Sequence, residues 1–125
     1  MGKYTNWITY KDKRILTVNA ARLGEAEIIA ALEEMKQELF RDRSGPLLLI
    51  DISGIDMTTA VINKAKELTA ATKDAGIPDG PNVIVGLTGL QKAVAQLFAR
   101  GVHFSDSVGE AKDWLVKQDE KRRKR

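Results

Sequence analysis

Residues 47–59 read LLLIDISGIDMTT, and the fold is predicted from this stretch. Four apolar residues, Leu47 to Ile50, follow one another without interruption, and Ile52 comes directly after Asp51. A short unbroken apolar run is typical of a strand buried on both faces, as strands are in parallel sheets with helices on either side. Such sheets bind ligands and partners at the carboxyl ends of their strands. Asp51 to Thr59 are therefore expected on the functional edge of an α/β domain.

The rest of the chain alternates between strand and helix patterns. Residues 4–10 and 14–19 predict an antiparallel hairpin, because β-branched and aromatic residues alternate on both sides of Lys11-Asp12-Lys13. Helices that separate later strands favour right-handed crossovers. Further strands are expected over 47–50, 82–87 and 102–104, and helices over 25–41, 58–74, 90–100 and 108–117. The sequence thus predicts a single-domain α/β fold, a mixed sheet of about five strands with four helices.

The composition limits the classes of site that the chain can build. The 125 residues suffice for one domain, and the absence of cysteine excludes disulfides and thiolate metal sites. His103 is the single histidine, so no histidine-based metal cluster is available, and we expect neither a metal nor a cofactor. No apolar run approaches the roughly 20 residues of a membrane span, and the N-terminus lacks an apolar leader segment. These features predict a cytoplasmic protein without a transmembrane segment.

Basic charge is concentrated at the C-terminus. The formal net charge is +3, but residues 121–125 are all Lys or Arg, and the other 15 basic residues face 17 acidic ones. The body of the domain is therefore mildly acidic, and a specific nucleic-acid partner is not expected. We predict a domain over 1–118 and a basic, disordered tail over 119–125, which could contact nucleic acid or an anionic membrane electrostatically.

Three motifs carry a resemblance to a known family. They are Asp51-Ile52-Ser53-Gly54-Ile55 at a strand exit, the strand and turn Val83–Leu90, and the segment Phe104–Leu115, which ends in E-A-x-x-W-L. Together they resemble the STAS family, the anti-sigma-factor-antagonist fold, over roughly residues 10–117. The last two are similar to the bacterial STAS-like group classed with the CRAL-TRIO lipid-transfer proteins. The resemblance implies a non-enzymatic regulatory or binding module. Its expected partner is a protein or a small hydrophobic or anionic ligand, and a homodimer is a further possible assembly of the chain.

The chain departs from the family at its phosphorylation motif. Phosphorylated antagonists carry D-S-S-G shortly after the first motif, and its serine accepts a phosphate from a partner kinase. The corresponding residues here, Thr59 to Ile62, contain no serine, so Thr58 and Thr59 are the candidate phosphoacceptors. A phosphorylation-switched antagonist is therefore the alternative function.

Two strand exits supply the candidate binding residues. The first leads into a helix N-terminus, where backbone N–H groups favour anions, and the second holds two glycines that allow close backbone approach. The same residues also fit ordinary turn and cap chemistry. An anion-binding hydrolase or phosphotransferase using Asp51 and Thr88 is a further alternative, but it lacks a catalytic base, and no catalytic residue is assigned. The predicted binding residues are Asp51, Ser53, Gly54, Asp56, Thr58, Thr59, Gly86, Thr88 and Gly89.

Overall fold

The structure is a computed structural model that describes residues 2–78, 80–88, 91–92 and 102–123. Its elements are β1 (Thr5–Tyr10), β2 (Lys13–Asn19), α1 (Glu25–Arg41), β3 (Leu47–Asp51), α2 (Thr59–Asp74), β4 (Asn82–Val85), β5 (His103–Ser105) and α4 (Val108–Arg123). The expected α/β class and five-stranded sheet are confirmed. The described residues hold three helices rather than the four expected. The helix predicted over 90–100 lies outside the described residues except for Gln91 and Lys92, which are helical.

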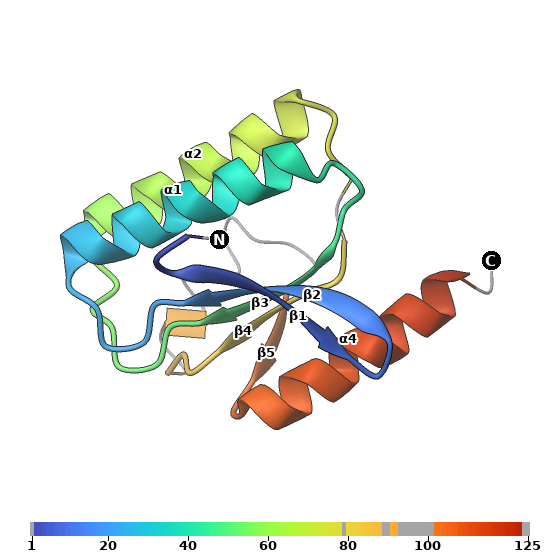
Figure 1. The fold of residues 1–125 in the computed structure, drawn as a ribbon. Coiled ribbons are helices and arrows are strands. Elements are labelled where there is room, and N and C mark those ends of the chain that lie inside the picture. The colour runs from blue at the N-terminus through green and yellow to red at the C-terminus, as the bar shows by residue number, and fades with distance from the viewer. Residues whose placement is uncertain (1, 79, 89–90, 93–101, 124–125) are drawn as a thin grey trace.

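The five strands lie in the sheet in the order in which they occur in the chain. β1 and β2 are antiparallel, and each of the pairs β2–β3, β3–β4 and β4–β5 is parallel, so the sheet is mixed. Helices α1 and α2 lie side by side over one face of the sheet, and α4 lies across the other (Figure 1). The carboxyl ends of β3 and β4 therefore meet at one edge, next to the start of α2.

The hairpin between β1 and β2 has a tighter turn than expected. Lys11 and Asp12 form it alone, with φ values of 49° and 66°, and Lys13 already belongs to β2. Positive φ at both positions is the rule for two-residue hairpins and usually calls for Asn or Gly. Here Lys11 Nζ and Tyr10 Oη both donate to Asp113 Oδ1 on α4, at 2.9 and 2.7 Å. These bonds fasten the turn to α4.

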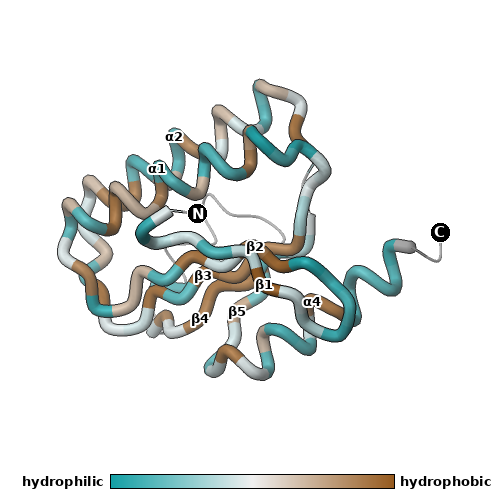
Figure 2. Tube along the Cα trace, in the orientation of Figure 1, coloured by the Kyte–Doolittle hydropathy of each residue, from teal (hydrophilic) through white to brown (hydrophobic). Residues whose placement is uncertain are grey.

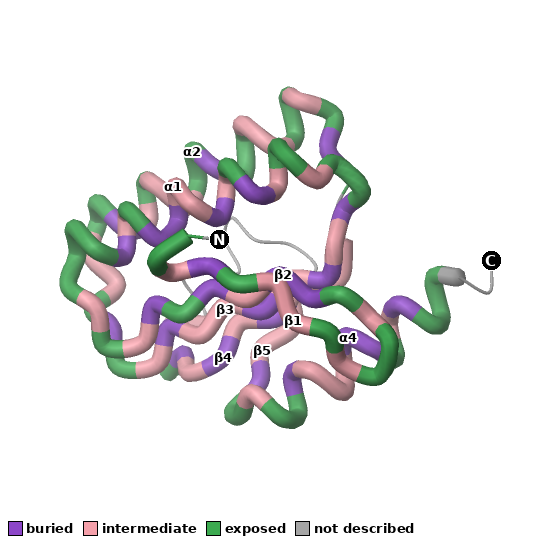
Figure 3. The backbone as a smooth tube through the Cα atoms, in the orientation of Figure 1, coloured by how far each residue is buried: buried purple, intermediate pink, exposed green. Residues whose placement is uncertain are grey.

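The central strand is covered unequally on its two faces. Leu47 and Leu49 are buried against α4, in a cluster with Val83, Ala111 and Leu115. Leu48 and Ile50 pack against the cluster on the α1–α2 side, and they are only half-buried. Buried and half-buried residues accordingly alternate along most of β3 (Figure 3). The predicted burial on both faces is thus complete under α4 and partial under α1 and α2.

The last helix corrects the expected C-terminal boundary. It begins at Val108 as predicted, but it runs to Arg123 instead of ending at Lys117. Its second half is hydrophilic (Figure 2), so an apolar stripe does not explain the extension. Asp119, only 2% exposed, pairs with Lys13 Nζ at 3.1 Å and with Arg122 Nη2 at 2.8 Å. The described part of the segment expected as a disordered tail, residues 119–123, is therefore helical, and the buried Asp119 carboxylate connects it to Lys13 of β2.

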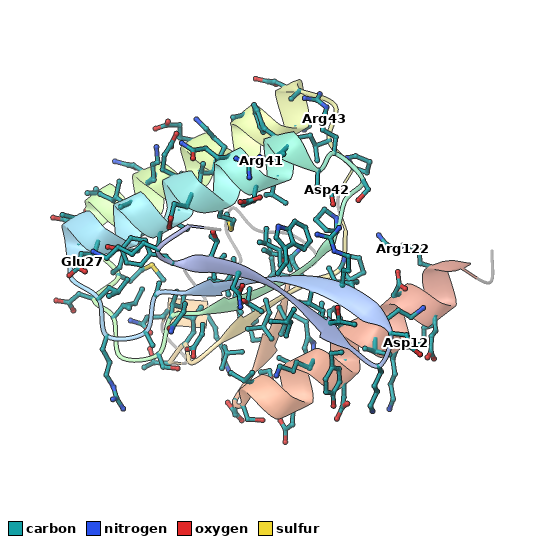
Figure 4. The ribbon with its side chains drawn as sticks, in the orientation of Figure 1. Asp12, Glu27, Arg41, Asp42, Arg43 and Arg122 are labelled. Atoms are coloured by element: carbon teal, nitrogen blue, oxygen red, sulfur yellow. The ribbon has the colours of Figure 1, made fainter. Side chains whose placement is uncertain are left out.

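Arg122 also connects α4 to the loop that follows α1. Its Nη1 donates to the Gly45 carbonyl at 3.0 Å, and Figure 4 shows Arg122 directed from α4 toward the loop that contains Asp42. Arg43 in the same loop donates to the Ala75 carbonyl at the end of α2. The ends of α1, α2 and α4 are therefore joined around one loop. Within the described residues, no helix is both long and apolar enough to cross a membrane.

Candidate functional site

The exit of β3 is a hydrogen-bonded turn. Asp51 Oδ1 accepts from the Ser53 backbone N at 3.1 Å and from Ser53 Oγ at 2.7 Å, which is the pattern of an aspartate-initiated turn. The Asp51 and Ser53 carbonyls accept from the Ala20 and Arg22 backbone N at 2.9 and 2.8 Å. The turn is thus fixed both to its own aspartate and to the segment that follows β2.

Two glycines allow this turn to pack closely. Gly54 and Gly86 have φ values of +71° and +94°, in the left-handed region that favours glycine. A Cβ on Gly86 would lie 2.6 Å from Ser53 Cα, so the β4 exit fits against the β3 exit only without a side chain. The structure therefore brings Asp51, Ser53 and Gly86 together, as expected for the carboxyl ends of neighbouring parallel strands.

The start of α2 places its two threonines differently. Thr58 is the N-cap residue, and its Oγ1 accepts from the Val61 backbone N at 3.3 Å while donating to Glu25 Oε1 of α1 at 2.6 Å. Thr59 is the first residue of the helix and is exposed, as is Asp56 in the preceding loop. The Thr58 hydroxyl is thus used in the fold, whereas the Thr59 side chain faces solvent.

The second exit contains a capping residue, Gln91, that is not among the predicted site residues. Thr88 backbone N donates to Gln91 Oε1 at 3.1 Å, and Gln91 backbone N donates to Thr88 Oγ1 at 3.3 Å. Gln91 Nε2 also donates to the Ile55 carbonyl at 3.2 Å, which links the two exits. The T-x-x-Q spacing is a capping-box signal from which Gln91 could have been found. Gly89, predicted for this site, lies outside the described residues.

Several polar side chains of this edge are already engaged in hydrogen bonds of the fold. The Asp51 carboxylate and the Thr58 and Thr88 hydroxyls already serve turns and helix caps. His103 stacks on Trp114, with ring centroids 4.3 Å apart and planes within 7°. Across the part of the chain that the structure describes, no three His, Cys, Asp or Glu side chains are grouped to hold a metal ion.

A large cavity lies beside this edge. It has a volume of about 730 Å³ and lies between the inner sides of α1 and α2 and the face of β3 and β4 that α4 does not cover. Leu48 and Ile50, the half-buried residues of β3, form part of its wall, and Lys36 and Lys73 are its charged lining residues among those described. Its apolar lining residues are Leu32, Met35, Leu39, Pro46, Leu48, Ile50, Ile52, Ile55, Met57, Val61, Ala65, Leu68, Ile77, Pro78, Ile84, Leu87 and Val102.

The size of this cavity is not encoded in any local pattern of the sequence. The apolar stripes of α1 and α2 were visible as helical periodicity, but such periodicity identifies an inner face without saying how closely it packs. Ile52, Ile55, Met57 and Leu87 line the cavity and flank the predicted polar residues. The cavity and the polar edge are therefore neighbouring parts of one region.

Comparisons with known proteins identify the fold. No family model matches the chain, and no curated protein matches it. An uncharacterised protein of the DUF3478 family with a SpoIIAA-like fold, from Shewanella loihica PV-4, is similar with a TM-score of 0.65 and 21% identity, over 89% of this chain and 91% of that one. A serine-to-glutamate variant of RsbS from Moorella thermoacetica is similar with a TM-score of 0.64 and 16% identity, over 93% and 97%. The resemblance to the anti-sigma-factor-antagonist fold is confirmed, and these likenesses speak to the fold alone.

Proposed function

We propose that the chain is a non-enzymatic regulatory or binding module that holds a small hydrophobic ligand in the cavity between α1, α2 and the sheet. The observation that carries this proposal is the apolar cavity of about 730 Å³. Ligand sites are concave, mostly apolar and of roughly 300–1,000 Å³. The cavity falls within this range, and most of its described lining residues are apolar.

The cavity lies inside the apolar layer between the sheet and α1 and α2, beside the buried cluster that includes Leu32, Val61 and Leu68. Unfilled space among apolar side chains forfeits dispersion contacts and destabilises the fold. Leu48, Ile50 and Ile84 stay half-buried on this face, while Leu49, Val83 and Val85 on the α4 face are at most 3% exposed. An apolar ligand would restore the missing contacts, so we expect it to bind and to stabilise the protein.

The direct test is mass spectrometry of the protein purified from its own cells. A mass excess under native conditions that disappears on denaturation supports a noncovalent ligand, and the same spectrum reports whether the chain is a homodimer. The matched variants are Ala65→Leu, in the cavity wall, and Ala70→Leu, exposed on α2. Ala65→Leu should reduce binding of the apolar dye ANS, while Ala70→Leu should not. A bare native mass together with no ANS binding would contradict the proposal.

The second candidate function is a phosphorylation-switched module. Such a module would bind its protein partner through the polar edge. It is favoured by Thr59, whose exposed side chain stands at the N-terminus of α2, where a phosphate is electrostatically favourable. Thr58 is the weaker phosphoacceptor because its hydroxyl caps the helix. Asp51, Ser53, Asp56 and the Gly86–Thr88 turn would form the surrounding surface.

The partner candidate has its own test. A mass increase of one phosphate that survives denaturation, and that is lost in Thr59→Val but kept in Thr58→Val, would assign the switch to Thr59. An unmodified mass from cells in every growth state would contradict it. A cytoplasmic location belongs to both candidates, and the cysteine-free sequence is consistent with a reducing compartment.

A further inference from the structure

The charged residues of the cavity wall share one sign. Lys36 of α1 and Lys73 of α2 line the cavity, and none of its described lining residues is acidic. The chain as a whole has 17 acidic residues, and Glu33, Glu67 and Asp74 lie on the same two helices. The charged side chains of the described wall are therefore cationic, and they stand among mainly apolar residues and the polar Thr69, Thr72 and Asn82.

The two lysines lie in the half of the cavity that is nearer the C-terminal ends of α1 and α2. Lys73 is in the last turn of α2, while Ile55 and Met57 line the cavity at the opposite end, before α2 begins. From Val61 to Lys73 the helix rises by about 18 Å, at about 1.5 Å per residue. Lys36 lies one turn beyond Glu33, the α1 residue that pairs with Lys64, and so toward the end where both helices finish. The cavity is therefore elongated, with an apolar end and a cationic end.

Both lysines are available to a ligand. Within the described part of the chain, Lys73 forms no ion pair, and its side chain is exposed at the cavity rim. Lys36 Nζ lies 3.3 Å from Glu33 Oε1, but Glu33 Oε2 also holds Lys64 Nζ at 2.7 Å. Glu33 therefore keeps a partner if Lys36 turns toward a ligand.

Free carbonyl oxygens at a helix C-terminus repel an anion, but at the end of α2 several of these oxygens already accept hydrogen bonds. The carbonyls of Ala71, Thr72 and Lys73 accept backbone N–H bonds from Ala75, Ile77 and Gly76, at 3.0 to 3.1 Å. The Ala75 carbonyl accepts from the Arg43 guanidinium. These carbonyl oxygens are directed to partners of their own, and Arg43 adds another positive charge at this end of α2.

We infer that the ligand of the cavity is a single-chain amphiphile with an anionic head group, which Lys36 and Lys73 receive while the hydrocarbon chain extends toward Ile55 and Met57. This inference rests on the proposed function, and it adds the chemical class and the direction of binding. A long-chain carboxylate is the simplest member of the class, because it combines an elongated apolar body with one negative charge. A neutral apolar ligand would leave the positive end of the cavity without a counter-charge.

The test compares three probes of one chain length that differ only in the head group: dodecanoate, dodecanol and dodecylamine. Their affinities are measured by displacement of ANS at low and at high salt, with each probe kept below its micelle concentration or, for dodecanol, below its solubility limit. We expect dodecanoate to bind roughly 3- to 10-fold more tightly than dodecanol, the range of one charge-assisted contact that is partly screened. Dodecylamine should bind most weakly, and high salt should reduce the advantage of dodecanoate.

Lysine variants assign the preference to its residues. Lys73→Met and Lys36→Met should each reduce the advantage of dodecanoate and leave dodecanol binding unchanged. Lys66→Met is the matched control, because Lys66 is an exposed lysine of α2 outside the cavity wall. Equal binding of dodecanoate and dodecanol would overturn the anionic-head inference and leave the proposed function standing. Binding of none of the three probes, without ANS binding, would instead contradict the proposed function itself.

Discussion

Replacing Gly86 with alanine tests the contact on which the polar edge is built. The backbone of Gly86 has a φ of +94°, and an alanine Cβ there would lie 2.6 Å from Ser53 Cα. The obstructing atom belongs to the backbone, so a change of side-chain rotamer cannot relieve the overlap. One of the two strand exits must move, and the hydrogen bonds between Asp51 and Ser53 would be disturbed with it.

The expected loss follows from two contributions. Placing an L-residue in a left-handed conformation costs about 1–2 kcal/mol, and overpacking a closely fitted contact costs about 1–3 kcal/mol. The free energy of unfolding should therefore fall by about 2–5 kcal/mol, out of the roughly 5–15 kcal/mol that is typical of a domain. Since urea slopes are about 1–3 kcal/mol per molar, we expect the urea midpoint to fall by about 1 M or more.

Equilibrium urea unfolding, followed by the fluorescence of Trp7 and Trp114, measures this change. The matched control is Gly109→Ala in the first turn of α4, where an added Cβ would have no neighbour within 4 Å. Alanine there should be neutral or stabilising, by up to about 1 kcal/mol. A loss below about 1 kcal/mol in Gly86→Ala would refute the close packing of Gly86 on Ser53.

Three further substitutions test other parts of the fold. Thr58→Ala removes the cap of α2 and its bond to Glu25, so it should lower the free energy of unfolding by about 1–2 kcal/mol. Thr58→Ser keeps a hydroxyl and should retain most of that stability. Equal urea midpoints for the two variants would contradict the capping role. Asp119→Asn leaves Lys13, whose side chain is 20% exposed, without its carboxylate, and should cost about 2–4 kcal/mol in the same assay, clearly more than Asp113→Asn in the exposed pair with Lys11. The Lys64 ammonium holds the pKa of Glu33 below its usual 4.5, so this pair stabilises the fold above about pH 4.5 and ceases to do so as the pH falls through the lower folded-state pKa. Lys64→Met should flatten the dependence of the urea midpoint on pH between about pH 5 and pH 3, and an unchanged slope would count against the pair.

Local patterns were sufficient for most of the fold. The run from Leu47 to Ile50 marked the central strand because apolar side chains on successive positions can be buried only if both faces of the strand are covered. The hairpin was recognised from its alternation although its turn lacks glycine, and the helical spacing in α1 gave its ends correctly. The meeting of Asp51 with Gly86 followed from the parallel arrangement, since neighbouring parallel strands end at the same edge.

Features that depend on long-range contacts could not be read from the sequence. The C-terminal half of α4 has no apolar stripe, and it is held by Asp119 and Lys13, which lie more than 100 positions apart. The size of the cavity depends on the distance between the sheet and helices α1 and α2, and hydrophobic periodicity does not encode that distance. The positive end of the cavity depends on which lysines of α1 and α2 turn inward, a choice that composition does not reveal.

The division of the sheet between helices on its two faces has a consequence for the synthesis of the chain. Both α1 and α2 are made before β4 and β5, so one side of the growing sheet is shielded early. Among the described elements, α4 alone covers Ile15, Leu47, Leu49 and Val83, and it is made after all five strands. Until then a nascent chain exposes the apolar side chains of neighbouring strands on this face, and exposed apolar surface of this kind makes a chain prone to aggregate. A chain truncated before α4 would therefore be prone to aggregate, whereas a chain truncated after α4 would be able to fold.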